Sequence, residues 1–547
     1  MSTLGHHKLT ARRRRSRREV SVNWGIKLDY LTRILNAKVY DVAIETSLAR
    51  ASLLSTRLGH NVLIKREDEQ PVFSFKLRGA YNKMAHLSAK QLAAGVVAAS
   101  SGNHAQGVAL AAQKLGTRAT IVMPKTTPSI KVDAVRSRGA NVVLFGESYS
   151  DSYEQALTIA TKSKKAFIHP YDDPDVIAGQ GTIGMEILRQ HQGDIDAIFV
   201  AVGGGGLIAG IASYVKAVRP KTKIIAVEPF DSSAMTQSLK AGRRVEIDNV
   251  GLFADAIAVK QVGKETFRLC QQLVDDTVLV TNDEICAAIK DVYTDCRSVL
   301  EPGGATAIAG LKKYCEQRRG TGKTYVAVAC GSNMNFDRLR FVAERAMLGE
   351  QREVVFAVTL PERPGSFRKF CDLLGPRAVT EFNYRYSNHI DGGGDAHVFV
   401  GIEVAHRKES TQLFKDFRAA ALRPVDLTDN EMAKLHVRHL VGGHSPGAAG
   451  ERVFRFDFPE RPGALAQFLR VMNSGWNITL FHYRNQGSDV GRVLAGIQAP
   501  DAERANLDDF LQRIANLGYA WVEETDNIAY KLFLGLHHGK APKAPTS

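Results

Sequence analysis

The sequence lacks any long apolar run. Its longest apolar stretch, residues 195–211, is interrupted by Asp196 and by several glycines, whereas a helix that crosses a bilayer needs about 20 consecutive apolar residues. The sequence therefore predicts no membrane-spanning segment and no membrane partner.

Cysteines are few and are not spaced for metal binding. None of the six forms a Cys-x-x-Cys motif, the spacing that occurs in zinc sites and redox pairs. We expect neither a zinc site nor a disulfide framework, which fits a reducing compartment. With 44% hydrophobic and 24% charged residues, the composition is that of a globular protein with about two to four domains.

Acidic residues are scarce at the amino end. Residues 1–20 hold seven Lys or Arg and one acidic residue, Glu19. This pattern is typical of a disordered, solvated extension, assigned to residues 1–27, and an organellar transit peptide is the alternative. No nucleic-acid-binding fold follows, so no nucleic-acid partner is expected. We expect a cytoplasmic protein, or an organellar one if residues 1–20 are a transit peptide.

Short β-branched runs alternate with Ala-rich segments as far as residue 349. The alternation predicts an α/β domain over residues 28–349, with a parallel sheet covered by helices and ligands at the carboxyl ends of the strands. The expected strands are residues 62–65, 96–99, 119–123, 141–144, 197–202, 223–228 and 325–330, and the expected helices include 105–115 and 177–190.

The remaining sequence contains an internal repeat. Residues 354–365 and residues 453–463 both end in Pro-Glu-Arg-Pro-Gly. Each copy is predicted to form a strand, a Pro-Gly turn, a helix and a further strand. We assign one domain to residues 350–440, a Gly-rich linker to 441–451, a second domain to 452–537, and a disordered tail to 538–547.

Four consecutive glycines, Gly203 to Gly206, follow the strand that ends at Val202 and precede an apolar helix that begins near Leu207. The N–H groups of successive glycines can converge on an anion without obstruction by Cβ atoms, and the helix N-terminus adds a favourable partial charge. A tight strand–helix turn needs fewer glycines, so we interpret this segment as a phosphate-binding loop.

A lysine and a polar turn accompany this loop. Lys76 lies in the sequence Ser-Phe-Lys-Leu-Arg-Gly-Ala, and the turn Ser-Ser-Gly-Asn-His at residues 100–104 joins a strand to a helix. The turn offers more donors than an N-cap needs, so it is suited to a substrate carboxylate. An amine, an asparagine-bearing turn and a polyglycine loop are together the parts that hold a phosphorylated aldehyde cofactor as a Schiff base.

These motifs resemble those of fold-type II pyridoxal-phosphate enzymes, and specifically of biosynthetic threonine dehydratases (threonine ammonia-lyases). The resemblance is carried by residues 65–68, 74–80, 100–107, 178–182, 203–207 and 301–305. It implies an α/β catalytic domain like the tryptophan synthase β subunit, with pyridoxal 5'-phosphate as the cofactor. The implied reaction is α,β-elimination that converts L-threonine to 2-oxobutanoate and ammonia, the first step of isoleucine biosynthesis.

The resemblance also implies roles for single residues. Lys76 would form the Schiff base and move the Cα proton, and Asn103 would hydrogen-bond the phenolic oxygen of the cofactor. The cofactor phosphate would be held by Gly203, Gly204, Gly205, Gly206 and Leu207. The substrate carboxylate would dock at Ser100, Ser101, Gly102 and His104, and Ser101 is also a catalytic candidate on the opposite face of Cα.

Cys330 begins a segment, Cys-Gly-Ser-Asn, that matches the family's Ser-Gly-Ala-Asn, whose first residue contacts the pyridine nitrogen. Cys330 takes that role here, in departure from the common serine; ordinary burial at a strand end is the alternative. A neutral thiol does not keep that nitrogen protonated as an aspartate would, so it favours elimination over transamination. Glu228 matches one ligand of a cation site in racemase relatives, but Ala234 replaces a second, so no metal is predicted.

The two C-terminal units resemble the ACT-like, α+β ferredoxin-like regulatory domains of the long threonine dehydratases. Gly365 and Gly463 would lie between a strand and a helix, where N–H groups can meet an amino-acid carboxylate. The resemblance implies isoleucine as inhibitor, valine as its antagonist, and a homotetramer; domains that serve only dimerisation are the alternative. The alternative activity is that of a serine/threonine dehydratase or serine racemase of the same fold type, and the paired tail argues against the racemase.

Overall fold

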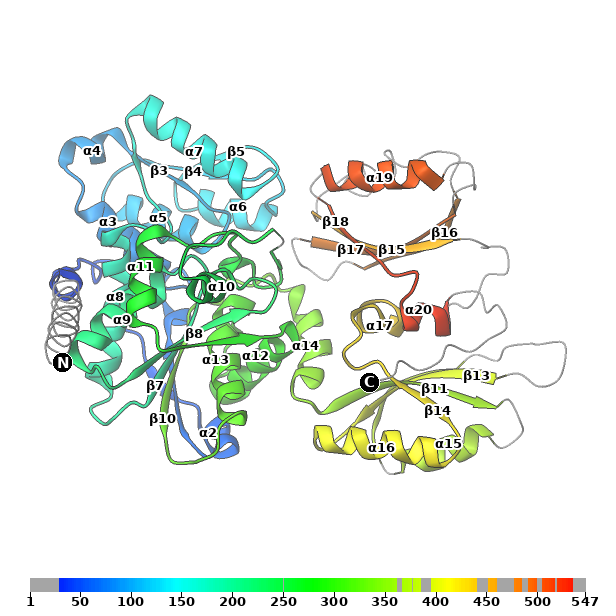
Figure 1. Cartoon of the computed structure of the whole chain (residues 1–547). Coiled ribbons are helices and arrows are strands. Elements are labelled where there is room, and N and C mark those ends of the chain that lie inside the picture. Colours follow the sequence, from blue (N-terminus) through cyan, green and yellow to red (C-terminus); the bar gives the residue numbers. More distant parts are fainter. Residues whose placement is uncertain are drawn as a thin grey trace, which may run out of the picture. The chain divides into compact units, whose positions relative to one another are not determined.

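The computed structural model describes residues 29–248, 250–361, 366–375, 377–384, 395–439, 451–459, 477–484, 490–498, 504–516 and 519–534. They form two compact units, divided between Phe336 and Asp337. The first unit is α/β, and the second contains two antiparallel sheets with helices (Figure 1). The expected amino-terminal extension, the linker up to residue 450 and the carboxy-terminal tail lie outside the described residues.

A six-stranded sheet forms the centre of the first unit. Its strand order is β1-β2-β10-β7-β8-β9, and all neighbours are parallel except β1 with β2. Strands β7 and β10 are nearly continuous runs of buried apolar residues, as expected where helices cover both faces of a sheet. The strands are β1 (Leu48–Arg50), β2 (Asn61–Arg66), β7 (Ala197–Ala201), β8 (Lys223–Pro229), β9 (Asp276–Val280) and β10 (Thr324–Ala329).

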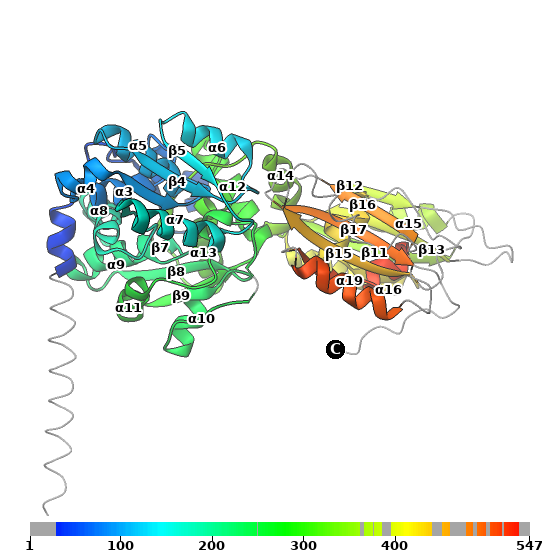
Figure 2. The same cartoon turned by 90° about the horizontal axis from the view of Figure 1, so that it is seen from above.

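A separate four-stranded parallel sheet, ordered β5-β4-β3-β6, lies beside the larger one with helices α4 to α7 (Figures 1 and 2). Ala105, Val108, Ala109 and Ala112 repeat at helical spacing along α5 and join the core formed with β3 and β4. The strands are β3 (Val96–Ala99), β4 (Ala119–Met123), β5 (Asn141–Leu144) and β6 (Ala166–Phe167).

The sequence predicted one sheet, and the structure has two. Strands β3, β4 and β5 have the predicted bounds, and β2, β7, β8 and β10 differ from prediction by one or two residues. The pattern missed β1, β6 and β9, of which β1 and β6 are too short to show a periodicity. Strand–helix alternation is the same for one sheet as for two, so the pattern does not reveal where pairing breaks.

Helix α3, which carries Lys76, packs closely on α8. A Cβ atom at Gly79 would lie 2.7 Å from the Val176 carbonyl oxygen, so this approach of the two backbones requires glycine. The helices of the first unit include residues 29–35 and α2 (Ser52–Leu58), α3 (Lys76–Ala85), α4 (Ala89–Ala94), α5 (Asn103–Lys114), α6 (Ser129–Arg136), α7 (Tyr149–Ser163), α8 (Pro174–Gln190), α9 (Gly206–Val218), α10 (Ala234–Ala241), α11 (Lys264–Leu273), α12 (Asn282–Cys296) and α13 (Pro302–Glu316).

Four charged side chains with no exposed surface hold α3 in place. Arg78 pairs with Glu67 (Nε–Oε2, 2.7 Å) and with Glu186 (Nη1–Oε1, 2.6 Å), and Lys65 also pairs with Glu186 (Nζ–Oε2, 2.6 Å). Burial by itself would raise the pKa of Glu67, but Arg78, Lys65 and Thr46 together outweigh burial, so that pKa is lowered. Every charge in this network has a partner. The network holds α3 in place at Arg78, which is only two residues away from Lys76.

The second unit contains two sheets of the same topology. The first is ordered β12-β13-β11-β14 and the second β16-β17-β15-β18, and all their neighbouring strands are antiparallel. The order agrees with the predicted ferredoxin-like repeat. The elements are α14 (Arg338–Gly349), β11 (Glu353–Pro361), α15 (Ser366–Leu374), β12 (Val379–Tyr384), β13 (Asp395–Glu403), α16 (Arg407–Ala419), β14 (Arg423–Asp426), α17 (Glu431–Leu435), β15 (Arg452–Pro459), β16 (Asn477–Arg484), β17 (Val490–Gln498), α19 (Arg504–Asn516), β18 (Ala520–Glu523) and α20 (Ile528–Phe533).

Helices α17 and α20 lie between these two sheets (Figure 1). Met432 and Ala433 from α17 and Ala529 and Leu532 from α20 belong to one buried core, which also contains residues of both sheets, such as Val355. The two ferredoxin-like domains therefore share a core, and the first also has a separate core of its own.

Candidate active site

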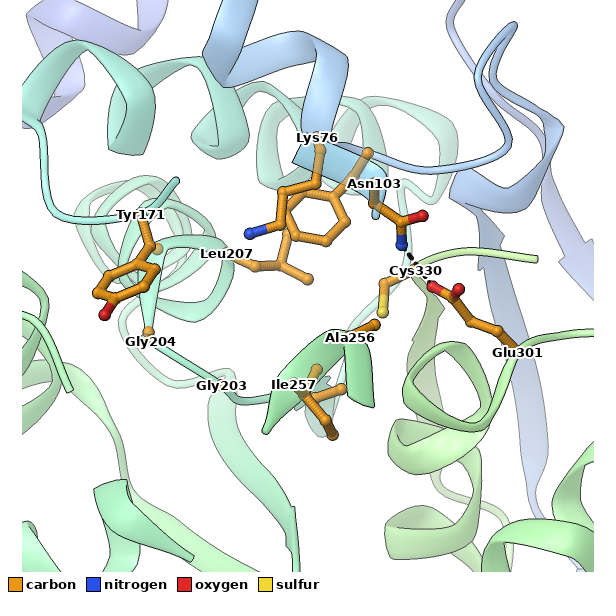
Figure 3. A pocket seen from close by; sticks show the side chains of 14 residues that line it. Lys76, Asn103, Tyr171, Gly203, Gly204, Leu207, Ala256, Ile257, Glu301 and Cys330 are labelled. Carbon is orange, nitrogen blue, oxygen red and sulfur yellow. Dashed lines mark hydrogen bonds between the residues drawn. The ribbon is translucent and has the colours of Figure 1, made fainter. Parts of the chain in front are cut away.

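Lys76 is the first residue of α3 and lines a pocket (Figure 3). The backbone N–H of Phe75 donates to the Cys330 carbonyl (3.3 Å), which places the lysine beside the end of β10. Its Nζ donates to the Pro170 carbonyl at 3.1 Å. Loss of solvation lowers the pKa of Lys76 to about 8, against smaller opposing effects of Cys330 and Glu301. A buried amine of this kind is readily neutral and hence nucleophilic.

The four glycines lie in the same pocket, between β7 and the start of α9. A Cβ atom at Gly203 would lie 2.9 Å from the backbone of Ile257, and one at Gly204 would lie 2.3 Å from the Tyr171 ring. Gly205 has a φ of +96°, which L side chains rarely adopt. The loop is thus a cradle of bare backbone at a helix N-terminus, a form suited to a phosphate group.

The shape of this loop is fixed by hydrogen bonds from α11. The Thr266 hydroxyl donates to the Gly204 carbonyl (2.6 Å), and the backbone N–H of Gly263 donates to the same oxygen (3.2 Å). Asp172 in turn accepts from three N–H groups at the start of α11. With its carbonyl turned toward Thr266, the peptide after Gly204 is held in one orientation.

Asn103 and Cys330 lie across the pocket from the loop (Figure 3). The Asn103 Nδ2 donates to Glu301 Oε1 at 2.6 Å. The Cys330 Sγ lies 3.4 Å from the Gly303 carbonyl, to which it donates. Burial, reinforced by the charge of Glu301, raises the pKa of the Cys330 thiol, so this group stays neutral at physiological pH.

The polar turn at residues 100–104 is only partly drawn into the pocket, since Asn103 alone among its residues lines it. The Ser100 hydroxyl accepts from the Gly102 N–H (3.2 Å), Ser101 is half-buried, and a Cβ at Gly102 would meet nothing within 4 Å. The His104 Nε2 contacts the Ile168 carbonyl at 2.9 Å. Burial, and then the charge of Lys76, lower the pKa of His104 to about 3, so this ring brings no positive charge to an anion.

Several lining residues had no role in the sequence prediction: Phe75, Tyr171, Ala256, Ile257 and Glu301. Tyr171 follows β6, and only the fold brings it beneath the glycine loop. Glu301 stands in one of the stretches that carry the family resemblance, and a Pro-Gly-Gly sequence follows it. That sequence signals a helix start, and α13 does begin at Pro302, but it does not signal a side chain in the pocket.

Gly365 and Gly463, the candidate regulatory residues, lie outside the described residues. Glu228 accepts hydrogen bonds from the N–H groups of Met235 (2.9 Å) and Thr236 (2.7 Å) and so caps α10, which begins at Ala234. Among the residues that the structure describes, no cluster of three His, Cys, Asp or Glu is arranged to hold a metal ion. Within the same ranges, no helix combines the length and the apolar character that crossing a membrane demands.

The fold and the pocket define the class of protein. Residues 39–331 match the family of pyridoxal-phosphate dependent enzymes, and residues 344–437 and 443–534 match the C-terminal regulatory domain of threonine dehydratase. The residues present fit the cofactor, because the loop offers bare backbone at a helix N-terminus, where a Cβ at any of the four glycines would strike a neighbouring residue, and a buried amine of lowered pKa faces the same pocket. The first unit is therefore a fold-type II pyridoxal-phosphate enzyme.

Whole-chain relatives identify the family. The chain is 58% identical to the biosynthetic L-threonine dehydratase of Burkholderia multivorans, over 92% of this chain and 99% of that protein. It is 49% identical to the mitochondrial threonine dehydratase of Saccharomyces cerevisiae, over 92% and 89%. The solved structure of processed threonine deaminase isoform 2 from Solanum lycopersicum matches with 55% identity and a TM-score of 0.58, over 58% of this chain and 93% of that one. The chain belongs to the biosynthetic threonine dehydratase family.

Proposed function

We propose that this chain deaminates L-threonine to 2-oxobutanoate and ammonia and thereby supplies isoleucine biosynthesis. The observation that carries the proposal is the meeting, in one pocket, of a buried amine of lowered pKa, a neutral thiol and a bare-backbone phosphate cradle. Two regulatory domains in the same chain support the threonine assignment over that of a racemase.

When bound, the cofactor supplies an electron sink that acidifies the Cα proton of an attached amino acid. Lys76 is placed to take that proton, since desolvation favours its neutral amine. Gly203 to Leu207 would hold the phosphate, and their fixed shape would position the cofactor relative to Lys76. Asn103 would donate to the phenolic oxygen.

Cys330 would lie beside the pyridine nitrogen as a neutral thiol, and could donate to it by turning its single S–H bond away from the Gly303 carbonyl. Ser100, Ser101, Gly102 and the backbone before His104 receive the substrate carboxylate, which is supported by the open space above Gly102 and by the N-terminus of α5. Since the pKa of His104 is about 3, we assign to that side chain a neutral role in shaping the turn. Ser101 is the candidate for the face of Cα opposite Lys76.

We further propose that the second unit binds isoleucine as inhibitor and valine as antagonist, with Gly365 and Gly463 in the effector sites, and that the enzyme is a homotetramer. A cytoplasmic location is proposed as well. The yeast relative is named mitochondrial, so an organellar location for this chain is the competing proposal, and a fluorescent fusion with and without residues 1–27 distinguishes the two.

The test is a product assay with purified enzyme. Threonine should yield equimolar 2-oxobutanoate and ammonia, serine should yield pyruvate by the same route, and Lys76→Ala should yield neither. Millimolar isoleucine should lower the rate, and valine should restore it. Formation of D-serine without 2-oxobutanoate would refute the assignment, and an unchanged rate with isoleucine would refute the regulatory part.

A further inference from the structure

A chain of hydrogen bonds runs from the backbone of one segment through two asparagines to a buried carboxylate. The Asn333 Nδ2 donates both to the Val72 carbonyl (2.8 Å) and to Asn103 Oδ1 (2.7 Å). The Asn103 Nδ2 then donates to Glu301 Oε1 at 2.6 Å. Asn333 comes three residues after Cys330, and Glu301 precedes α13, so these hydrogen bonds join segments that are far apart in the sequence.

The two ends of this hydrogen-bond chain determine which way the Asn103 amide points. A backbone carbonyl such as that of Val72 can only accept, so the side of Asn333 that faces it must be the nitrogen, and the same nitrogen faces Asn103. The atom of Asn103 that meets it must therefore be the oxygen. At the other end, Glu301 Oε1 accepts from the nitrogen of Asn103 at 2.6 Å, which agrees with that orientation. Both ends of the hydrogen-bond chain therefore place the Asn103 nitrogen toward Glu301.

The carboxylate that ends the chain is itself held firmly. Glu301 is 4% exposed, and its backbone N–H donates to the Gly331 carbonyl at 3.2 Å. A Cβ atom at Gly331 would lie 2.4 Å from Glu301 Oε1 and 3.2 Å from Asn103 Nδ2. The strand end that carries Cys330 is thus packed directly against the carboxylate, and a side chain at residue 331 would displace it.

Each amide nitrogen carries two N–H bonds, and one of those on Asn103 is used by Glu301. The Asn103 side chain lines the pocket with Lys76, and Figure 3 shows its nitrogen on the side that meets Glu301. A flipped amide would present an oxygen at that point and would repel an anionic phenolic oxygen. In the observed orientation Asn103 can therefore offer the cofactor a hydrogen-bond donor, whereas in the flipped orientation it would offer an acceptor.

We propose that Asn333 and Glu301 are positioning residues that lock the Asn103 amide so that its second N–H bond serves the phenolic oxygen of the cofactor. This inference rests on the contact between Asn103 and that oxygen in the proposed function. Asn333 acts only through Asn103. Glu301 orients the same amide, in addition to the effect of its charge on the pKa values of Lys76 and Cys330.

The experiment measures two properties of reconstituted full-length enzyme: the dissociation constant for pyridoxal 5'-phosphate and the pH titration of its visible absorption band. Asn103→Ala loses a hydrogen bond to a charged oxygen and should weaken binding by about tenfold or more. Asn333→Ala should weaken it by about two- to tenfold, the usual cost of a neutral hydrogen bond. In both variants the apparent pKa of the band should rise, because the phenolic oxygen loses a donor that stabilises its anionic form.

A double-mutant cycle decides whether Asn333 and Glu301 act through Asn103. Introduced into an Asn103→Ala background, Asn333→Ala and Glu301→Gln should have no further effect on the dissociation constant, and Asn333→Ala none on the titration. Full, additive effects in that background would overturn the proposal, and so would an Asn333→Ala enzyme that behaves as wild type. If Asn103→Ala binds the cofactor and titrates as wild type does, the proposed contact between Asn103 and the phenolic oxygen is wrong. The inference then fails because its premise fails, an outcome that differs from additive effects in the double mutants.

Asn82→Ala is the matched control. Asn82 is buried, whereas Asn333 is half-buried, but its side chain likewise makes two hydrogen bonds, from the Lys38 N–H (2.8 Å) and to the Asp175 carbonyl (2.6 Å), and it does not line the pocket. Its loss should lower the Tm of the apoenzyme about as much as Asn333→Ala does, and should leave the absorption titration unchanged. A titration shift in this control as large as that of Asn333→Ala would show that general loosening, and not amide orientation, causes the effect.

Discussion

Gly204 is the position where one added methyl group should most disturb cofactor binding. In Gly204→Ala, the new carbon would lie 2.3 to 2.4 Å from three carbons of the Tyr171 ring, far inside van der Waals contact. That ring packs edge-on against His169 with centroids 4.7 Å apart, which limits its retreat. Overpacking of this kind costs about 1–3 kcal/mol, which corresponds to a roughly 5- to 150-fold weaker affinity if the loop must regain this shape to bind phosphate.

The assay is titration of apoenzyme with pyridoxal 5'-phosphate, followed by absorbance, with the Tm of the apoenzyme measured in parallel. Part of the penalty will appear in the Tm if the loop keeps its shape without cofactor. In a Tyr171→Ala background the methyl has room, so adding Gly204→Ala there should cost little. Gly116→Ala is a suitable control, because Gly116 has a φ of +64° but no neighbour within 4 Å; it should lower the Tm and leave affinity unchanged. Wild-type affinity in Gly204→Ala would refute the reasoning.

Three further predictions concern the pocket and its support. Burial lowers the pKa of Lys76 to about 8, so the fraction of neutral amine increases up to that pH. The rate at which apoenzyme combines with cofactor, followed by stopped flow, should therefore rise to about pH 8 and then level off. A rate that still increases near pH 10 would contradict the lowered pKa. Arg78→Ala would leave buried Glu67 without its paired arginine and Glu186 with Lys65 alone, and should cost about 3–5 kcal/mol in urea unfolding. Arg136→Ala, at an ion pair with Asp133 in which both side chains are exposed, should cost under about 1 kcal/mol; equal losses would be inconsistent with the buried network. Cys330→Ser exchanges one neutral donor for another and should keep kcat within about tenfold, and a larger fall in steady-state assays would show that the thiol has a role beyond neutrality.

The strands and the glycine loop were predictable because their signals are local. A run such as residues 197–201 is wholly apolar and buried, and four consecutive glycines after it have few structural uses. The role of Lys76 was predictable only in combination with the other motifs. Its lowered pKa, in contrast, depends on surroundings that no local pattern encodes.

Tyr171 and Glu301 could not be predicted from the sequence as parts of the site. Tyr171 lies beneath the glycine loop only because β6 joins the smaller sheet while the loop follows β7 of the larger one. Glu301 and Asn333 meet Asn103 through side-chain geometry that sequence spacing does not report. The structure has two sheets where one was expected, because strand pairing depends on long-range contacts, and the periodicity of short strands does not report such contacts.

The core shared by α17 and α20 limits how freely the regulatory half can be taken apart. A polypeptide that stopped after the first ferredoxin-like domain would present Val355, Met432 and Ala433 to water without the residues of α20 that cover them. Such a fragment would be prone to self-association. The two domains therefore form a single structural module, which has to be deleted or transplanted as a whole, although the sequence repeat suggests that each domain is separable.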